Sequence, residues 1–441
     1  MNVKDIEMKE QPESGSGSGG SGGARQNIQS PRGTKDILPG ETEKWQQMEA
    51  HLGTVLQRAG YREIRLPMFE HTELFHRGVG ETTDIVNKEM YTFLDRSDRS
   101  LTLRPEGTAG VVRAYLAHGL SRQPSPVKLW YCGPMFRYER TQTGRQRQFH
   151  QTGVEAFGSA GPAIDAEVIL LAVDCLHALS VRNFAVHLNS IGDVNCRPAY
   201  KEKLKEALRP HLSNLCPDCQ ERFERNPLRM LDCKNPECQK YYKDLPSSLD
   251  NLCADCRAHW DELLGLLTAL GIEPVINERL VRGLDYYSRT VFEVIADDPR
   301  LGVQSTILAG GRYDYLVESL GGETTPAVGW ACGMERISLL MSDAGGLKPR
   351  AFIVSDSAVA ALKLATELRH AGIACDLDYP PAGSKPRAFK RQFEKASKSG
   401  ASWALILGEK ELADNTVTVK NMEKQTQETV SMQDLIPYLQ K

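Results

Sequence analysis

Three arginines stand in stretches that are otherwise patterned like buried strands or like a strand running into a helix. Arg137 follows the apolar run VKLWYCGPMF, Arg282 lies near the start of VRGLDYYSRTVFEV, and Arg336 follows GWACGME. A guanidinium group is planar, and its fork of donors can bind two phosphate oxygens at once. Any one of these arginines could form an ordinary surface ion pair, but three that converge on one sheet would suit a nucleoside triphosphate.

The sequence carries neither of the standard phosphate-binding loops. A Walker-type G-x-x-x-x-G-K-[ST] is absent, and no strand-to-helix turn has the form G-x-G-x-x-G. Gly310, Gly311, Gly329 and Gly333 are instead placed where backbone could approach a flat ligand such as adenine. No Ser-His-Asp arrangement is legible. The chemistry indicated is therefore the binding and orientation of charged substrates, without a protein nucleophile.

A hairpin that includes one of these arginines carries further polar chemistry. Residues 127–139 and 148–157 predict two strands joined by a polar turn. Side chains alternate between the two faces of a strand, so Gln151, Gly153 and Glu155 share one face. Such a face can simply be solvated. It can also be a binding platform, on which the glycine leaves room for a small molecule.

The segment Arg104–Thr108 predicts a turn that opens a helix. Glu106 and Thr108 place a carboxylate and a hydroxyl at this strand-to-helix corner, where they could hold the ammonium group of a ligand. The simpler interpretation is that Glu106 is a first-turn acid favoured by the helix dipole. The local sequence does not separate these two interpretations.

Changes in composition divide the chain into three parts. Residues 1–24 are rich in Gly and Ser, which is typical of a flexible linker. Residues 25–346 are predicted to form the main domain, with a charged, cysteine-rich helical insertion at about 195–272. Residues 347–441 alternate strand and helix, which predicts a small α/β domain with its own sheet.

Within the main domain, the apolar spacing predicts a helix at Glu41–Ala59 and a strand at Val281–Ala296. A further strand is predicted at Tyr61–Phe69, interrupted by Pro67. Proline cannot donate to a strand ladder, so this strand is expected at a sheet edge or at an interface between subunits.

Overall composition places the chain among globular proteins of the cytoplasm. With 441 residues it can build two or three domains with proper cores, and its net charge of −3 excludes a histone-like polycation. A nucleic-acid partner on a local basic face stays possible. No apolar run reaches the length of a membrane span, and the N-terminus lacks the basic-then-apolar pattern of a signal peptide.

Eleven cysteines in such a chain are expected to be thiols or metal ligands rather than disulfides. Two C-x-x-C pairs have the spacing of a zinc ribbon, which predicts one structural zinc site. Reduced thiols without metal are the alternative. The predicted ligands are Cys216, Cys219, Cys253 and Cys256, and Cys233 and Cys238 lie between the two pairs.

Four stretches together resemble a known family. FRYERTQTGRQRQFHQTGVEAFG is similar to the second signature of class II aminoacyl-tRNA synthetases, in the form used by histidyl-tRNA synthetases. VRGLDYY and AGGRYD resemble the two histidine-specific signatures of that family, and GWACGMERI resembles the third class signature. The resemblance extends from Pro31 to Lys441. Two loop positions depart from it, Thr141 in place of proline and Gln146 in place of an aromatic residue.

The resemblance implies an α+β fold, with an antiparallel-sheet catalytic domain, a helical insertion and a C-terminal α/β anticodon-binding domain. It also implies ATP-dependent activation of L-histidine with Mg²⁺, transfer of histidine to tRNA(His), and a homodimer. A basic helix at 387–399 of the C-terminal domain would then face RNA, although a basic run is usually just solvated. Its two phenylalanines, Phe389 and Phe393, are expected to be core residues.

Carried over by motif, the resemblance gives roles to individual residues. Arg137 and Arg282 become the catalytic groups at the α-phosphate, and no residue is assigned as a metal ligand in the catalytic site. The residues implied to bind histidine are Glu106, Gly107, Thr108, Arg137, Gln151, Glu155, Arg282, Tyr286 and Tyr287. Those implied to bind ATP are Arg137, Arg145 and Arg336, and those near the acceptor end of the tRNA are Arg140 and Gln142.

The imidazole assignment agrees with elementary chemistry, because both ring nitrogens need a partner and Glu155 with Tyr287 can supply the two. The main alternative is a catalytically inactive, histidine-sensing regulatory paralogue that serves ATP phosphoribosyltransferase. Such a paralogue would be expected to lose the arginines and the anticodon-binding domain. Their presence also disfavours a nucleic-acid-binding scaffold with an inactive core.

Overall fold

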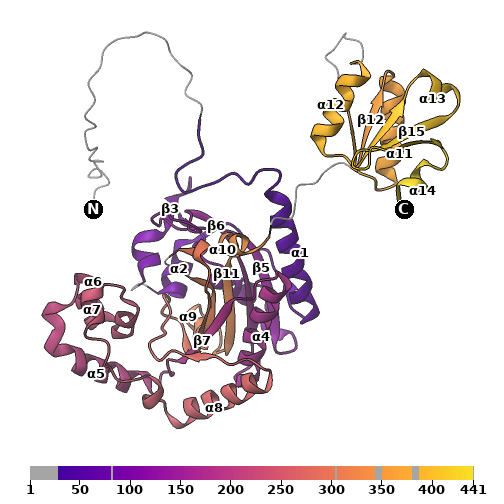
Figure 1. Cartoon of the computed structure of the whole chain (residues 1–441). Helices are drawn as coiled ribbons and strands as arrows, with labels where there is room; N and C mark the ends of the chain where they lie inside the picture. Colours follow the sequence, from indigo (N-terminus) through magenta and orange to yellow (C-terminus); the bar gives the residue numbers. More distant parts are fainter. Residues whose placement is uncertain (1–27, 81–82, 303–304, 343–349, 380–386, 441) are drawn as a thin grey trace, which may run out of the picture.

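The structure is a computed structural model of the whole chain (Figure 1). It describes residues 28–80, 83–302, 305–342, 350–379 and 387–440. The predicted linker at 1–24 lies outside the described residues. Within the described part of the chain, no helix is long and apolar enough to cross a membrane.

An eight-stranded sheet forms the centre of the N-terminal part of the chain. Its inner pairings are all antiparallel, and only the two edge strands pair in parallel with their neighbours. The antiparallel catalytic sheet that the sequence predicted is thereby confirmed. In sheet order the strands are β1 (Arg62–Glu63), β5 (Val127–Phe136), β6 (Gln148–Phe157), β11 (Ala327–Gly333), β10 (Thr306–Arg312), β9 (Ser288–Ala296), β7 (Phe184–Ser190) and β8 (Val275–Ile276).

Helices cover one face of this sheet and form the main hydrophobic core. Trp130 and Val154 point from β5 and β6 into the same buried cluster as Met48, Leu176 and Leu263 of the helices. Each such side chain contributes about 1.5–3 kcal/mol when it is removed from water. The covering helices are α1 (Thr42–Arg58), α4 (Pro162–Ala178) and α8 (Ala254–Ala269).

The opposite face of the sheet has a smaller apolar cluster and carries the polar groups. Tyr131, Phe157 and Tyr313 pack there against α3 (Thr108–Ala117) and α9 (Leu316–Ser319). Strand alternation places Glu155 on this second face, between residues that point into the core. The face that parity predicted to be polar is therefore only partly filled by apolar packing.

The predicted hairpin is confirmed as β5 and β6, which pair from Val127 with Phe157 to Phe136 with Gln148. Arg137 lies one residue beyond the end of β5, where its amide N–H donates to the carbonyl of Arg147 at 2.8 Å.

Two predicted strands differ from the structure. The run Tyr61–Phe69 is split into β1 and β2 (Phe69–His71) because Pro67 falls between them, and both pieces are edge strands as expected. The predicted strand at Val281–Ala296 begins only at Ser288. Residues 281–287 form a loop instead, whose Gly283 carbonyl accepts a hydrogen bond from Arg229 of the insertion.

A small three-stranded sheet and the insertion complete this part of the chain. The small sheet has the order β2-β4-β3, and its further strands are β3 (Tyr91–Leu94) and β4 (Ser100–Leu103). The insertion is helical, as predicted. Its segments are α5 (Arg197–Leu208), η3 (Arg209–Asn214), α6 (Pro217–Arg225), η4 (Pro227–Asp232), α7 (Pro236–Gln239), η5 (Leu249–Asn251) and α8. In Figure 1 α5, α6 and α7 lie away from the sheet, whereas α8 packs in the main core.

The C-terminal part has its own five-stranded sheet and its own core, which confirms the predicted α/β domain. The strands β13, β12 and β14 are parallel, while β15 and β16 continue the sheet in antiparallel pairs. In sheet order they are β13 (Cys375–Leu377), β12 (Ala351–Ser355), β14 (Trp403–Leu407), β15 (Thr416–Asn421) and β16 (Gln427–Ser431). The helices are α11 (Ala358–His370), α12 (Phe389–Ser399), α13 (Glu409–Ala413) and α14 (Leu435–Gln440).

Candidate active site

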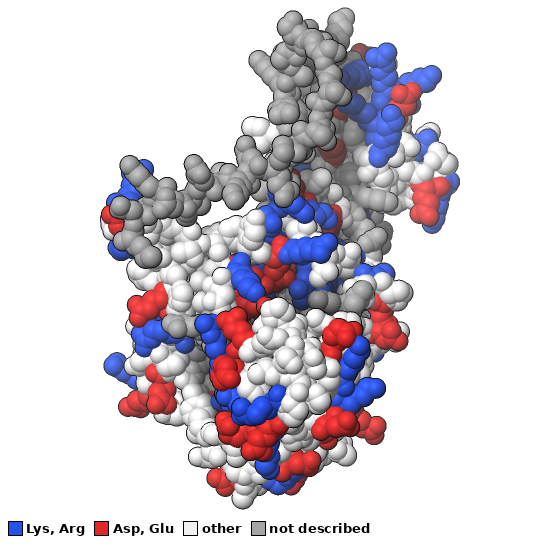
Figure 2. All heavy atoms as spheres, turned by 90° about the vertical axis from the view of Figure 1, so that its left-hand side faces the viewer, with Lys and Arg blue, Asp and Glu red and all other residues white. Residues whose placement is uncertain are grey.

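A cavity of about 670 Å³ opens on the polar side of the large sheet, and five arginines line it, one of them Arg279. Arg137 and Arg145 come from the hairpin, Arg282 from the loop before β9, and Arg336 from α10 (Met334–Leu340). The expectation that the three arginines singled out in the sequence would converge on one sheet is therefore met. On the face shown in Figure 2, positive and negative side chains are interspersed over this part of the chain.

The hairpin arginines are oriented by acceptors in the cavity wall. The Nε of Arg137 donates to the carbonyl of Pro105 at 2.8 Å, and its guanidinium lies 5.2 Å from the centre of the Phe149 ring. Glu139 stands between the two arginines, with oxygens 3.6 Å from Arg137 and 2.9 Å from Arg145. The outer nitrogens of both guanidinium groups are thus held at the rim of the cavity.

Arg282 faces Glu293 and Tyr287. One of its terminal nitrogens contacts Glu293, and the other carboxylate oxygen of Glu293 accepts from Thr306 Oγ1 at 3.0 Å. The Nε of Arg282 is buried and makes no hydrogen bond with any residue that the structure describes. An unpaired buried donor costs about 1–3 kcal/mol, so a ligand oxygen at this position would be favoured.

Arg336 lies at the start of α10 and is 9% exposed. Its Nη1 donates to the carbonyl of Thr306 at 2.7 Å. Burial lowers the pKa of Arg336, and the positive charge of Arg145 lowers it further. The two guanidinium groups repel each other across the cavity, and an anion placed between them would relieve that repulsion.

A second, deeper group of polar side chains lies behind the arginines. The carboxylate of Glu106 accepts from the backbone N–H groups of Thr108 at 2.6 Å and Ala109 at 2.9 Å. The hydroxyl of Thr108 donates to Glu155 at 2.7 Å, and Tyr313 donates to the other oxygen of Glu155. Glu106 therefore accepts from the first turn of α3, as the simpler interpretation predicted, and its place beside Thr108 leaves the binding of an ammonium group as a prediction.

Glu155 is 1% exposed and lies far from bulk water. Burial raises the pKa of Glu155 to about 8, although the hydrogen bonds from Tyr313 and Thr108 act in the opposite direction. Burial likewise raises the pKa of Glu106. Perturbed carboxyl groups of this kind gather at functional sites, since a structural core has little reason to retain them.

Two tyrosines from the VRGLDYY loop pack beside this buried polar cluster around Glu155. The rings of Tyr286 and Tyr287 lie 4.6 Å apart, and the ring of Tyr286 lies 5.5 Å from that of Tyr313 in an edge-on contact. The side-chain oxygen of Gln151 is buried and accepts no hydrogen bond from the residues that the structure describes. This buried polar cluster therefore combines aromatic rings with an unused acceptor, and none of its residues lines the arginine-lined cavity.

The interpretation of Gly153 as floor space for a ligand is wrong. Tyr131 is its direct partner across the hairpin, and a Cβ at Gly153 would lie 2.4 Å from the Tyr131 hydroxyl. A Cβ at Gly107 would meet the same ring at 2.3 Å. Both glycines thus make room for the buried ring of Tyr131.

The residues assigned to tRNA lie elsewhere, on the turn of the hairpin. Arg140 and Gln142 are exposed, and backbone hydrogen bonds of 2.8 and 3.2 Å between Gln142 and Arg145 fix the turn. This turn connects the cavity rim to solvent. The geometry lets a large ligand touch the hairpin while a small ligand occupies the cavity.

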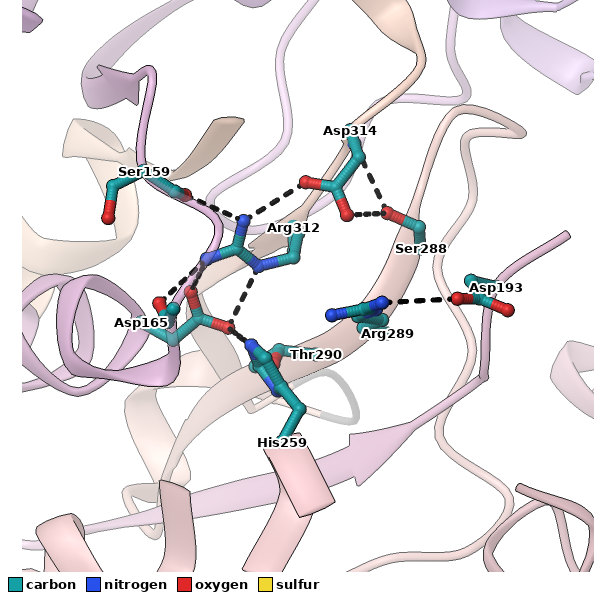
Figure 3. Close-up of polar contacts among 10 residues, drawn as sticks. Ser159, Asp165, Asp193, His259, Ser288, Arg289, Thr290, Arg312 and Asp314 are labelled. Carbon is teal, nitrogen blue, oxygen red and sulfur yellow. Dashed lines mark hydrogen bonds and ion pairs between the residues drawn. The ribbon is translucent and has the colours of Figure 1, made fainter. Parts of the chain in front are cut away.

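Sequence reasoning missed four residues of this region. Tyr131 packs over Gly107 and Gly153, and Tyr313 donates to Glu155. Glu139 orients two arginines, and Arg312 is bonded to Asp165 within the fold. Figure 3 shows Arg312 enclosed by Asp165, Asp314 and the carbonyl of Ser159. A charged residue after two glycines in an apolar strand was the available signal for Arg312.

The predicted zinc ligands do not form one site. Cys216 and Cys219 lie in one group with Cys233 and Cys238, whereas Cys253 and Cys256 lie in a separate group with Cys196 and Asp193. The prediction of a single site from the two C-x-x-C pairs is therefore wrong. Sequence spacing alone could not show which cysteines the helices of the insertion bring together.

An antiparallel sheet with an arginine-lined cavity on its polar face, followed by a separate α/β domain, is the architecture of a class II aminoacyl-tRNA synthetase. The profile described as histidyl-tRNA synthetase matches residues 33–337, and that of an anticodon binding domain matches residues 352–441. The chain belongs to the histidyl-tRNA synthetase family.

Individual relatives agree with this assignment. The chain is 50% identical over 418 residues to a histidine–tRNA ligase of Desulforamulus reducens, covering 93% of this chain and 98% of the relative. It is 52% identical over 415 residues to one of Thermosynechococcus vestitus, covering 93% and 95%. The crystal structure of apo S. aureus histidyl-tRNA synthetase superposes with a TM-score of 0.79 at 36% identity, covering 94% of this chain and all of that one.

Proposed function

We propose that this chain is a histidine–tRNA ligase. It activates L-histidine with ATP to give histidyl-adenylate, and then transfers histidine to the 3′ end of tRNA(His). The observation that carries the proposal is the juxtaposition of the arginine-lined cavity and the buried polar cluster around Glu155. The arginines suit a triphosphate, and the polar groups of the cluster suit a small polar amino acid.

In the activation step an oxygen of the histidine carboxylate attacks the α-phosphorus of ATP, and the bond to the pyrophosphate leaving group breaks. Negative charge grows on the phosphoryl oxygens, and fixed cations stabilise it without having to reorganise. Arg137 and Arg282 serve the α-phosphate and the carboxylate, with the unpaired Nε of Arg282 as a ready donor. Arg145 and Arg336 hold the outer phosphates.

Histidine binds at the buried polar cluster around Glu155, next to the arginines. Its ammonium group is held by Glu106, Gln151 and the Thr108 hydroxyl, while the Gly107 backbone lets the Tyr131 ring approach. Its imidazole is read by Glu155 and Tyr287, beside Tyr286. An amino acid that lacked the two ring nitrogens would leave these buried polar groups unpaired, which is how such a site rejects it.

Magnesium is compatible with the cavity. Mg²⁺ prefers oxygen ligands and is usually held by one or two carboxylates together with substrate phosphates. Glu139 and Glu335 both line the cavity and would supply such oxygens. When bound, the ion neutralises charge on the triphosphate. The arginines of the chain orient the α-phosphate.

Recognition of tRNA would use the exposed hairpin turn and the C-terminal domain. Arg140 and Gln142 are placed to approach the acceptor end. On α12, the residues Lys390, Arg391, Lys395 and Lys398 are exposed, whereas Phe389 and Phe393 pack against the core as predicted. Figure 2 shows positive side chains gathered on the facing side of this domain. Lys385, a further basic residue just before this helix, lies outside the described residues.

The organisation of the whole chain follows from this function. A catalytic domain at 25–346, with an insertion at 195–272, precedes an anticodon-binding domain at 347–441, and the Gly/Ser-rich residues 1–24 come before both in the sequence. The protein works in the cytoplasm as a homodimer. Support for a subunit interface comes from β2 and β3, where Phe69, Phe93 and Leu94 are exposed apolar side chains.

The regulatory alternative is not favoured. Arg137, Arg282 and Arg336 are all present and line one cavity, and the C-terminal domain matches an anticodon-binding profile. The structure described as an ATP phosphoribosyltransferase regulatory subunit/histidyl-tRNA synthetase from Bacillus halodurans is 22% identical to this chain with a TM-score of 0.63. That likeness concerns the fold alone.

Exchange of labelled pyrophosphate into ATP tests the proposal directly. Folded protein should catalyse this exchange when L-histidine is added and should not do so with phenylalanine or glutamine. Charging of tRNA(His) in the same preparation tests the second step. Absence of histidine-dependent exchange would overturn the proposal.

A further inference from the structure

Four thiols of the insertion lie close together at the base of α6 and η4. All four sulfurs of Cys216, Cys219, Cys233 and Cys238 lie within 4.8 Å of one another, and those of Cys216 and Cys233 are 3.8 Å apart. Tetrahedral zinc with Zn–S bonds of about 2.3 Å holds its sulfurs about 3.8 Å apart. A disulfide would bring two sulfurs to about 2.0 Å. The spacing is therefore that of metal ligands.

Backbone amides already point at these sulfurs. The N–H of Cys216 donates to the sulfur of Cys238 at 3.2 Å, and the N–H of Asn235 donates to that of Cys233 at 3.4 Å. Such donors stabilise the negative charge of thiolates that bind a metal. Cys216 is also the residue that caps α6, so its sulfur and that of Cys219 stand at the positive end of the helix.

The surroundings give the thiols a structural task. The local core of this subregion is small, and three of its eight buried residues are cysteines. Small units that bury little apolar surface commonly depend on a metal or on disulfides for stability. We propose that Cys216, Cys219, Cys233 and Cys238 bind a structural zinc ion.

A second group, Asp193 with Cys196, Cys253 and Cys256, also has the arrangement of a zinc site, and separate distances support it. The sulfurs of Cys196 and Cys256 are 3.8 Å apart, and Asp193 Oδ1 lies 3.7 Å from the sulfur of Cys196 and 4.0 Å from that of Cys253. Asp193 is 2% exposed, and its other oxygen is paired with Arg289 at 3.2 Å, as Figure 3 shows. Zinc accepts one carboxylate beside three thiolates, and the arginine fixes the carboxylate from behind.

The two zinc sites flank the loop 281–287. On one side, Asn226 Nδ2 donates to Asp285 at 2.9 Å, from the segment that leads into η4 and Cys233. On the other side, Arg197 Nη1 donates to the carbonyl of Tyr287 at 2.7 Å, next to Cys196. Zinc at both sites would hold the insertion rigid against the loop that carries Arg282. Only this positioning role rests on the proposed function, and zinc binding itself does not.

Metal content of the full-length protein, purified without chelator, tests both sites. Two zinc ions per chain are expected by plasma mass spectrometry. Cys233→Ser and Cys256→Ser should each retain one ion, and Cys375→Ser, whose thiol belongs to neither group, should retain two. If Cys233→Ser loses zinc and Cys256→Ser does not, the second site is overturned. If Cys256→Ser loses zinc and Cys233→Ser does not, the first site is overturned. Absence of zinc from the protein would overturn both sites. So would an intact mass lowered by the hydrogens that are lost when these thiols form disulfides.

A second measurement separates loss of the ligand from loss of the fold. Cys233→His keeps a zinc-binding group at the same position and should hold two zinc ions, while Cys233→Ser holds one. Cobalt-substituted wild-type protein should show thiolate-to-metal charge-transfer absorption. That absorption should weaken in each serine variant and persist in Cys375→Ser. Equal metal content in Cys233→His and Cys233→Ser, with both folded by circular dichroism, would contradict the first site.

Discussion

Arg312 and the arginines of the cavity are the same residue type in two opposite situations. All five N–H donors of Arg312 are used by its own chain, on Asp165, Asp314 and the carbonyls of Ser159 and Gly161, and its side chain is fully buried (Figure 3). Arg282, by contrast, is paired with Glu293 and keeps a buried Nε without a partner among the described residues.

The difference shows how the role of an arginine can be inferred. An arginine whose donors are saturated has no capacity left for a ligand, so it stabilises the fold. An arginine with an unused donor on a cavity wall carries a cost that a substrate can remove. The network around Arg312 lies behind β9 and β10, where Thr290 donates to Asp165 at 2.6 Å and His259 approaches it at 3.4 Å.

The largest effect is expected from Arg312→Met. This change leaves Asp165 buried without its cation, which typically costs about 3–5 kcal/mol. The free energy of unfolding, measured by urea denaturation, should fall by that amount. The double variant Arg312→Met with Asp165→Leu should recover part of the loss because both charges are removed. A single variant as stable as wild type would show that the network is not structural.

Arg282→Ala should have the reverse profile. Removing a fixed donor to a developing negative charge lowers the rate by about 10²–10³-fold. Histidine-dependent pyrophosphate exchange should therefore fall by that factor, while the urea midpoint stays close to that of wild type. Arg300→Ala, which removes only a surface pair with Asp298, serves as the control for both measurements. Near-normal exchange by Arg282→Ala would refute its assignment at the α-phosphate.

Glu155 shares a feature with each of these arginines. Both of its oxygens accept hydrogen bonds, as the donors of Arg312 are all used, and yet its burial makes ionisation costly. Its pKa is raised from the ordinary 4.5 to about 8 by burial. Between these two values the unfolded chain has lost the proton that the folded protein still holds. The free energy of unfolding should thus fall as pH rises, by up to ~1.4 kcal/mol per pH unit.

Glu155→Gln cannot titrate at this position, so its unfolding free energy should vary less steeply over the same pH window. Urea denaturation of both proteins at several pH values measures the difference between the two slopes. Parallel slopes would mean that Glu155 is already ionised in the folded protein.

The smallest effect is expected at the exposed hairpin turn. Arg140→Ala should leave pyrophosphate exchange unchanged, because the side chain lies outside the cavity. Charging of tRNA(His) should weaken modestly, and the salt dependence of tRNA binding should lose about one unit of slope for the one lost phosphate contact. An equal loss in both assays would place Arg140 in the activation site instead.

The sequence by itself determined the elements that depend on local pattern. Alternation along β6 put Gln151 and Glu155 on one face, and the proline at position 67 ended a strand. Helical spacing predicted α1 to within a residue at each end. The convergence of Arg137, Arg282 and Arg336 was also predictable, since a charged residue in an apolar run is costly unless it is used.

Only the tertiary structure decided how these elements meet. Register across the hairpin placed Tyr131 over Gly153, and no pattern within one strand could specify that pairing. Long-range packing separated Cys216 from Cys253 and brought Asp193 to Cys256, because helices fix which side chains share a pocket. Long-range packing also buried Arg312 completely and left the Nε of Arg282 without a partner among the described residues. A hydrogen bond depends on distance in space, and sequence spacing gives that distance only within a single helix or strand.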